Sequence, residues 1–255
     1  MSVSTTLSAD QSSASLRFFH AKGNILTEEI ITDLRAALET LTAHPHLKLV
    51  TIAGEGPDFS FGASIPEHMP ELIGRVLPLM DAFVQELLEV PSTTAAVVRG
   101  RCLGGGFEIA LACDLIFAAE NAVFGLPEVA LGVFPPAASA LLPLRAGYAR
   151  ATELIVSGRS VGAAEMESAG LVQMVAADAD LAQHVDEWFE RHLRPKSAAA
   201  LRHAAAAARF GLAAHVRATL PALEQIYLDD LMRTHDAVEG VRAFLDKRPP
   251  TWLDR

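Results

Sequence analysis

Short apolar segments alternate with longer segments of helical periodicity through most of this chain, and that alternation limits the folds available to it. Residues 16–19, 47–53 and 93–98 have the length of buried strands, whereas residues 27–41 and 66–90 repeat apolar side chains at helical spacing. Strands that alternate with helices build a sheet covered by helices. The pattern therefore predicts an α/β fold.

The alternation continues to residue 175 and then ends. Two more short strands are expected, at residues 115–118 and 171–175, and beyond residue 178 every segment has helical character. We place a boundary near residue 194, which gives a core of residues 1–194 and a helical C-terminal region of residues 195–255. Such a region without its own strand is expected to pack across the core or onto another subunit. Its expected helices cover residues 181–193, 197–210 and a long stretch to 245.

Composition excludes several classes of protein. Of the 255 residues, 51% are hydrophobic and 20% are charged, so the chain can bury a large core and is not expected to be disordered. The 31 acidic residues exceed the 21 Lys and Arg residues by ten, and the resulting net charge of −10 does not suit nucleic acid as a partner. Residues 122–144 are nearly all apolar but contain four prolines, which a membrane-spanning helix would not hold.

The N-terminal residues and the cysteines indicate a compartment. The first eleven residues lack the basic start and apolar stretch of a secretory signal. Cys102 and Cys113 are too few for a disulfide framework and have no histidine at metal-ligand spacing. We therefore expect a cytoplasmic protein that holds no metal.

Three consecutive glycines, Gly104 to Gly106, lie between a predicted buried strand and a predicted helix. Glycine costs stability in such a position, so its presence there suggests a purpose. The free N–H groups at a helix start can hold an anion or a developing oxyanion, whereas tight packing of the strand against the helix is the structural alternative. The motif lacks the Lys-Ser or Lys-Thr of a phosphate-binding loop and the glycine spacing of a dinucleotide site.

Two glutamates follow constrained turns in apolar surroundings. Glu108 lies in the first turn of the glycine-initiated helix, and Glu128 is the only charged residue between Glu120 and Arg145. A buried carboxyl has a raised pKa and can act as an acid, although a surface Glu108 that interacts with the helix dipole stays open. Two such carboxyls suit the addition or removal of water across a polarised double bond. The loop of residues 59–64 could present an N–H group toward the same space as Gly105.

The order and spacing of these features resemble the crotonase, or enoyl-CoA hydratase/isomerase, superfamily. The resemblance implies a spiral of ββα units whose C-terminal helices build homotrimers, often paired as hexamers. It also implies an acyl-CoA substrate, with coenzyme A as part of the substrate and no separate cofactor. The matching stretches are residues 21–26, 59–65, 99–114, 124–132, 163–172 and 239–248.

The resemblance assigns roles to individual residues. The backbone N–H groups of Ala63 and Gly105 would stabilise the enolate of the thioester, which is the largest expected catalytic contribution. Glu108 would hold and deprotonate water and Glu128 would deliver a proton, with the division between the two left open. The residues implied to contact coenzyme A are Lys22, Ala63, Ser64, Ile65 and, from a neighbouring subunit, Lys247 or Arg248.

Two departures from common hydratases concern the acyl pocket. Ser64 stands where an Asp is usual, and the segment after Glu128 has bulk and no glycine. That segment is residues 134–139, and together with the loop of residues 61–64 it resembles the alicyclic dienoyl-CoA hydratases of anaerobic aromatic degradation. The reaction expected is hydration of cyclohexa-1,5-diene-1-carbonyl-CoA by 1,4-addition, in which Glu128 would have to reach a distant ring carbon. The acyl-pocket residues implied are Phe134, Pro135, Pro136, Ala137 and Ala138.

Two alternatives to this function stay open. The chain could be an acyclic enoyl-CoA hydratase of fatty-acid β-oxidation, which would add water to a linear acyl group. It could instead be a non-catalytic acyl-CoA-binding scaffold in which the altered loop reflects lost activity. The presence of both glutamates argues against the scaffold, because two buried carboxylates cost stability when they do no chemistry.

Overall fold

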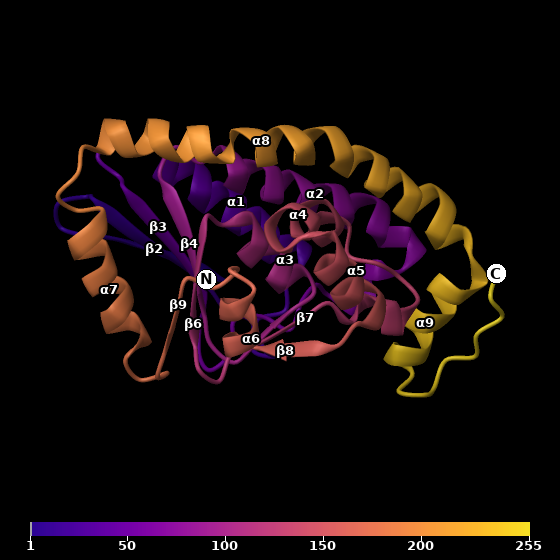
Figure 1. The fold of residues 1–255 in the computed structure, drawn as a ribbon. Helices are drawn as coiled ribbons and strands as arrows, with labels where there is room; N and C mark the ends of the chain where they lie inside the picture. Colours follow the sequence, from indigo (N-terminus) through magenta and orange to yellow (C-terminus); the bar gives the residue numbers. More distant parts are fainter. Residues whose placement is uncertain (1) are drawn as a thin grey trace.

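The computed structural model describes residues 2–255, and its α/β architecture agrees with the sequence-based prediction (Figure 1). The main sheet has six strands in the order β1-β2-β3-β4-β6-β9, and a second sheet has the order β5-β7-β8. The strands are β1 (Val3–Leu7), β2 (Ser13–Phe18), β3 (Leu49–Gly54), β4 (Thr93–Val98), β5 (Arg101–Leu103), β6 (Leu115–Ala119), β7 (Val123–Gly125), β8 (Ser160–Gly162) and β9 (Met174–Ala176).

The main sheet is parallel from β2 to β9, as expected when helices connect successive strands. Its first strand differs from the prediction, in which residues 16–19 are the first expected strand. Residues 3–7 form β1, which pairs antiparallel with β2, with Val3 opposite Phe18 and Leu7 opposite Ala14. An edge strand needs only one bonded neighbour, and the Val and Thr residues of β1 have good strand propensity.

Helices cover the main sheet and extend beyond it. The α-helices are α1 (Glu28–Thr42), α2 (Pro70–Glu89), α3 (Gly105–Ala112), α4 (Pro136–Ala146), α5 (Tyr148–Ser157), α6 (Ala163–Ser168), α7 (Leu181–His192), α8 (Ala198–Gln225) and α9 (His235–Leu245). Shorter helical turns are η1 (Ile65–His68), η2 (Pro127–Leu131), the π-helical η3 (Ile226–Asp230) and η4 (Leu231–Arg233).

Several element boundaries differ from the sequence prediction. The helix expected over residues 66–90 is the turn η1 followed by α2, and α2 continues through Pro78. The last strand is β9 at residues 174–176, slightly later than the expected residues 171–175. The helix expected over residues 197–210 extends to Gln225, because the apolar residues Val216 and Leu220 bury its second half against the core.

The helical C-terminal region packs on the rest of the chain. Figure 1 shows α8 running along the whole molecule above α1, α2 and α4, before the chain turns down into α9. Helix α8 contacts both α2 and α4, and α9 contacts the turns η1 and η2. The predicted boundary at residue 194 lies in the short connection between α7 and α8.

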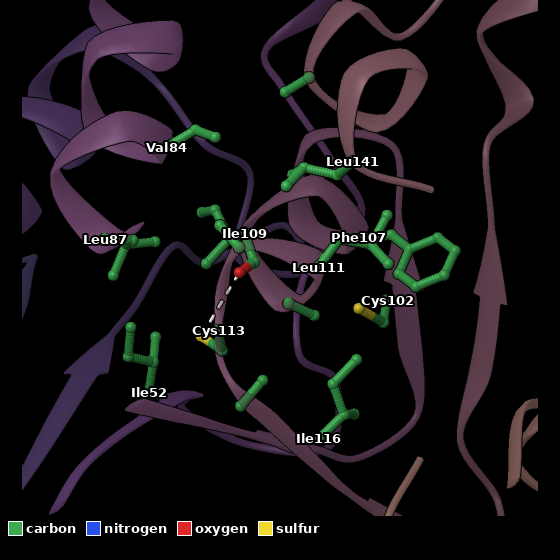
Figure 2. Close-up of a cluster of buried hydrophobic side chains, with 14 of the residues drawn as sticks. Ile52, Val84, Leu87, Cys102, Phe107, Ile109, Leu111, Cys113, Ile116 and Leu141 are labelled. Atoms are coloured by element: carbon green, nitrogen blue, oxygen red, sulfur yellow. Dashed lines mark hydrogen bonds between the residues drawn. The ribbon is translucent and has the colours of Figure 1, made fainter. Parts of the chain in front are cut away.

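Helix α3 is surrounded by apolar side chains on every side. All eight of its residues are buried, including Phe107, Ile109 and Leu111. Figure 2 shows these side chains among Val84 and Leu87 of α2 and Leu141 of α4. The Cys113 thiol donates a hydrogen bond of 3.4 Å to the Ile109 carbonyl, so it acts as a core residue. A helix so enclosed is held rigidly, and it carries Gly105 and Glu108.

Candidate active site

Two loops that are distant in the sequence are joined by backbone hydrogen bonds. The Ser60 N–H donates to the Arg101 carbonyl at 2.9 Å, and the Leu103 N–H donates to the Ser60 carbonyl at 2.9 Å. The loop of residues 59–64 therefore runs beside β5, which leads directly into α3. This pairing brings the predicted loop and the glycine motif together.

Close approach explains two glycines of the motif. Gly104 has φ of +51°, and a Cβ there would lie 2.6 Å from Oε1 of Glu128. A Cβ on Gly106 would lie 2.6 Å from Cβ of Ser60. Side chains would therefore displace both Glu128 and the neighbouring loop. The packing explanation of the glycines holds at these two positions, and the functional explanation of Gly105 stays a prediction.

The amide groups of Ala63 and Gly105 lie close to each other and are free. A Cβ built on Gly105 would lie 3.5 Å from the Ala63 nitrogen. Within residues 2–255, neither amide donates a hydrogen bond to a backbone or side-chain acceptor. Gly105 is the first residue of α3, where N–H groups have no partner inside the helix. Two adjacent unpaired donors can hold one carbonyl oxygen.

Glu108 lies one turn into α3 and is 6% exposed. Its Oε1 accepts a hydrogen bond of 2.8 Å from the Ala138 N–H, in the first turn of α4. Burial raises the pKa of Glu108 to about 7, and the N–H groups of Ala138 and Ala137 oppose that rise. The alternative that Glu108 is a surface residue interacting with the helix dipole is therefore wrong, because the apolar residues of α3 and α4 enclose its carboxyl.

Glu128 lies on the turn η2, which ends at Gly132 with φ of +73°. The residue as a whole is half-buried, but its Oε2 is fully buried and has no hydrogen-bond partner within residues 2–255. Burial, and then the charge of Glu108, raise the pKa of Glu128 to about 8. The two glutamates are thus close enough to interact. Glu128 lies against Gly104, and Glu108 lies in the helix that the glycine motif starts.

The turn that carries Lys22 is bound to the same loop. The Phe61 N–H donates to the Gly23 carbonyl at 2.9 Å, and the Ser64 N–H donates to the Leu26 carbonyl at 2.9 Å. Lys22 itself is exposed, and Ser64 and Ile65 continue the loop into η1. The structure therefore brings Lys22 into the same region as Ala63.

Lys247 lies exposed just after α9. Among residues 2–255 no hydrogen bond links its side chain to Lys22 or to the loop of residues 59–64. Its neighbour Arg248 pairs with Glu239 through both guanidinium N–H groups. A role for Lys247 in a neighbouring subunit stays a prediction.

The segment predicted as acyl pocket lies beside both glutamates. Ala137 and Ala138 are fully buried, and their backbone faces Glu108 rather than only lining a cavity. Pro136 occupies the first position of α4, which suits proline and leaves the following N–H groups free. This backbone role does not follow from the bulk of these side chains, on which the predicted acyl pocket rests.

The site contains two polar side chains that sequence reasoning missed. Asp81 of α2 is 3% exposed, and neither of its carboxyl oxygens has a donor within residues 2–255. Tyr227 of η3 is 1% exposed, and its hydroxyl is likewise unpartnered there. The Tyr227 ring packs edge-on against the Phe134 ring, with 5.4 Å between the ring centroids. The sequence signal for Asp81 was its place as a charged residue among the regularly spaced apolar residues that α2 buries.

Residues 2–255 contain no group of His, Cys, Asp and Glu side chains arranged to hold a metal ion. None of the helices in this range combines the length and apolar character needed to cross a membrane.

Comparison with known proteins decides the family. Residues 11–255 match the family model described as Enoyl-CoA hydratase/isomerase. This chain belongs to the enoyl-CoA hydratase/isomerase family. The predicted family and crotonase-like fold are therefore confirmed.

Individual members of the enoyl-CoA hydratase/isomerase family are similar over nearly their whole length. The chain is 44% identical over 249 residues to cyclohexa-1,5-dienecarbonyl-CoA hydratase of Thauera aromatica, covering 98% of this chain and 96% of that protein. It is 32% identical over 243 residues to a probable mitochondrial enoyl-CoA hydratase of Dictyostelium discoideum, covering 91% and 84%. A crystal structure of an enoyl-CoA hydratase from Mycobacterium avium subsp. paratuberculosis K-10 matches with a TM-score of 0.88 at 30% identity, covering 100% and 99%.

Proposed function

We propose that this chain adds water to an unsaturated acyl-CoA thioester, with cyclohexa-1,5-dienecarbonyl-CoA as its substrate. The reaction class rests on two free amides and two buried glutamates gathered at one helix start. The substrate rests on the 44% identity to the Thauera aromatica hydratase, across 98% of this chain. Coenzyme A enters as part of the substrate, and no separate cofactor takes part.

The Ala63 and Gly105 amides bind the thioester oxygen in this proposal. Both N–H groups lack another acceptor, so they can donate to that oxygen without first breaking a bond. Their donation strengthens as water attacks the β-carbon and negative charge moves onto the oxygen. The enclosed helix α3 holds Gly105 in place throughout the reaction.

Glu108 and Glu128 handle the water and its proton. Glu108 is partly ionised near neutral pH, since its pKa is about 7, and it accepts the proton of the attacking water. Glu128 is mostly protonated there, since its pKa is about 8, so it can hold the water and supply a proton to the enolate. The pair interacts, so the observed titrations belong to both carboxyls together.

We also propose a binding mode for the two ends of the substrate. Lys22, Ser64 and Ile65 receive the coenzyme A end, because their turn and loop are bonded together beside Ala63. Phe134 with residues 135–138 borders the acyl group. We propose that the chain works as a homotrimer or hexamer in the cytoplasm, with Lys247 adding charge across an interface.

A panel of thioesters tests this function. The ring diene thioester should be hydrated at least about tenfold faster than crotonyl-CoA at saturation, because the altered segment after Glu128 shapes the acyl pocket. Faster turnover of crotonyl-CoA would instead favour an acyclic enoyl-CoA hydratase, the activity named for the Dictyostelium discoideum relative. Thermal protection by the thioesters without any consumption would identify a binding scaffold.

A further inference from the structure

The ring substrate poses a geometric problem that two neighbouring glutamates do not solve. Water adds to the ring carbon β to the thioester, and the electrons spread along the second double bond to its far end. The carbon that takes the proton then lies across the six-membered ring from the carbon that took the water. An acid on a different wall of the pocket suits this step better than one beside the water.

Asp81 is a buried carboxyl on α2, a different element from α3 and η2, which carry Glu108 and Glu128. It follows Ile73 and Leu77 on one face of α2, since residues four apart on a helix lie above one another. Ile73 and Leu77 belong to the apolar cluster that includes Val133 and Tyr227, with Phe134 packed against it. Asp81 therefore continues the stripe of α2 that meets the predicted acyl pocket.

The surroundings of Asp81 favour a carboxyl that carries a proton. Burial is the main cause that raises the pKa of Asp81 to about 8, and the charges of Glu108 and Glu224 raise it further. Both of its oxygens are buried, and neither has a hydrogen-bond partner among the described residues 2–255. Glu224 of α8 is only half-buried, so it offers Asp81 a neighbour that reaches solvent.

Tyr227 provides a second, independent observation at the same place. Its hydroxyl is buried without a partner within residues 2–255, and burial, followed by the charges of Glu128 and Glu108, raises its pKa. It lies in the π-helical turn η3, a rare local structure that often occurs at functional sites. A native protein seldom leaves buried polar groups unpaired, so two of them beside the glutamates indicate a space that a ligand or water completes.

We propose that the Asp81 carboxyl, in place of Glu128, is the acid that protonates the distal ring carbon, and that Tyr227 positions the ring against it. The inference rests on the proposed ring substrate. The water oxygen bonds to the β-carbon and its proton goes to the Glu108 carboxylate. The dienolate electrons then form the new C–H bond with the proton of Asp81, and the remaining double bond shifts next to the thioester.

The step leaves Glu108 protonated and Asp81 ionised. Glu108 is a close neighbour of Asp81, so a proton moved from one to the other restores the starting state without any additional reactant. Glu224 gives a second route, by exchange with solvent. A linear enoyl-CoA needs only a proton at its α-carbon, so its hydration should depend on Glu108 and Glu128 and not on Asp81.

The test compares Asp81→Asn with the matched control Glu89→Gln, which alters an exposed carboxyl on the same helix. In heavy water, Asp81→Asn should lower turnover of the ring diene by about 10² or more and move deuterium in the residual product from the distal carbon to the α-carbon. Hydration of crotonyl-CoA and the control variant should change less than about threefold. Ring turnover near that of the wild type, or equal losses on both substrates without a shift of the label, would overturn the proposal.

A measurement on the unaltered protein makes the test independent of how the variant folds. Protein labelled with ¹³C-aspartate should show the infrared carbonyl band of a protonated aspartic acid near neutral pH, and binding of the ring product should shift it. Absence of that band, or a band insensitive to the product, would contradict the role of Asp81. A wild-type enzyme that hydrates crotonyl-CoA but never the ring diene would instead contradict the proposed function itself.

Discussion

The Ala138 N–H donates a hydrogen bond of 2.8 Å to Oε1 of Glu108, whereas Oε2 of Glu128 has no partner within residues 2–255. A helix start therefore stabilises one carboxylate, while its neighbour lies buried without such support. The pKa of Glu108 is raised to about 7 and that of Glu128 to about 8. This asymmetry is the physical basis for giving the two glutamates different tasks.

The pH dependence of kcat/KM should follow from that asymmetry. With crotonyl-CoA as substrate, activity should rise as Glu108 loses its proton near pH 7 and fall as Glu128 loses its proton near pH 8, giving a narrow bell-shaped profile. Initial rates of the free enzyme at low substrate concentration measure it. A flat profile across this range would contradict the proposed proton transfers.

Removing either carboxyl should slow the chemical step more than it weakens binding. With crotonyl-CoA as substrate, Glu108→Gln and Glu128→Gln should each lower kcat by about 10² or more, because the amide can neither accept nor supply a proton. The Kd for the product thioester should stay nearly the same. A variant that keeps wild-type turnover at saturation would show that its residue has no part in proton transfer.

Gly105→Ala tests the pair of amide donors. The new methyl group would lie 3.5 Å from the Ala63 nitrogen, an ordinary contact that the fold tolerates but that covers the space for the thioester oxygen. We expect kcat to fall by about 10² to 10³. Gly211→Ala is a matched control, since its Cβ meets nothing within 4 Å and it should leave activity unchanged. Equal activity of the two variants would argue against the oxyanion site.

Glu128 should make the folded protein less stable as pH rises. Its pKa is raised from 4.5 to about 8, so the folded chain holds a proton that the unfolded chain has already lost in this range. The contribution of Glu128 to the free energy of unfolding therefore decreases as the pH rises from 4.5 to about 8. Glu128→Gln removes the titration, so urea unfolding at about pH 5 and pH 9 should show a smaller decrease than in the wild type. An identical decrease in both proteins would rule out this contribution.

The oligomer can be tested together with Lys247. Light scattering should give a mass that is a multiple of three chains, in line with the resemblance stated for the C-terminal helices. Lys247→Ala should raise the Kd for coenzyme A thioesters about fivefold, which corresponds to about 1 kcal/mol of binding free energy, because a single charge contact is lost. The kcat should stay unchanged. A stable, active monomer would remove both the oligomer and the contribution of Lys247 from a neighbouring subunit.

Local sequence patterns determined much of this protein. Alternating periodicity predicted the α/β class, since strand and helix repeats bury one face each. The glycines at residues 104–106 predicted a close approach before a helix, and the structure shows that approach with Ser60 and Glu128. Glu108 was identified because a carboxyl in an apolar helix is rare. Each of these signals is contained within about ten consecutive residues.

Tertiary structure decided what depends on neighbours distant in the sequence. Strand β1 forms because β2 offers it a bonded edge, and the short strands β5, β7 and β8 form by the same mutual pairing. The acidity of Glu108 depends on Ala138, thirty positions away. Asp81 and Tyr227 become neighbours of the glutamates only in the folded chain, where α2 packs against α3 and η3 continues from α8. Burial and charge act through space, so sequence spacing alone cannot reveal which carboxyls share a proton.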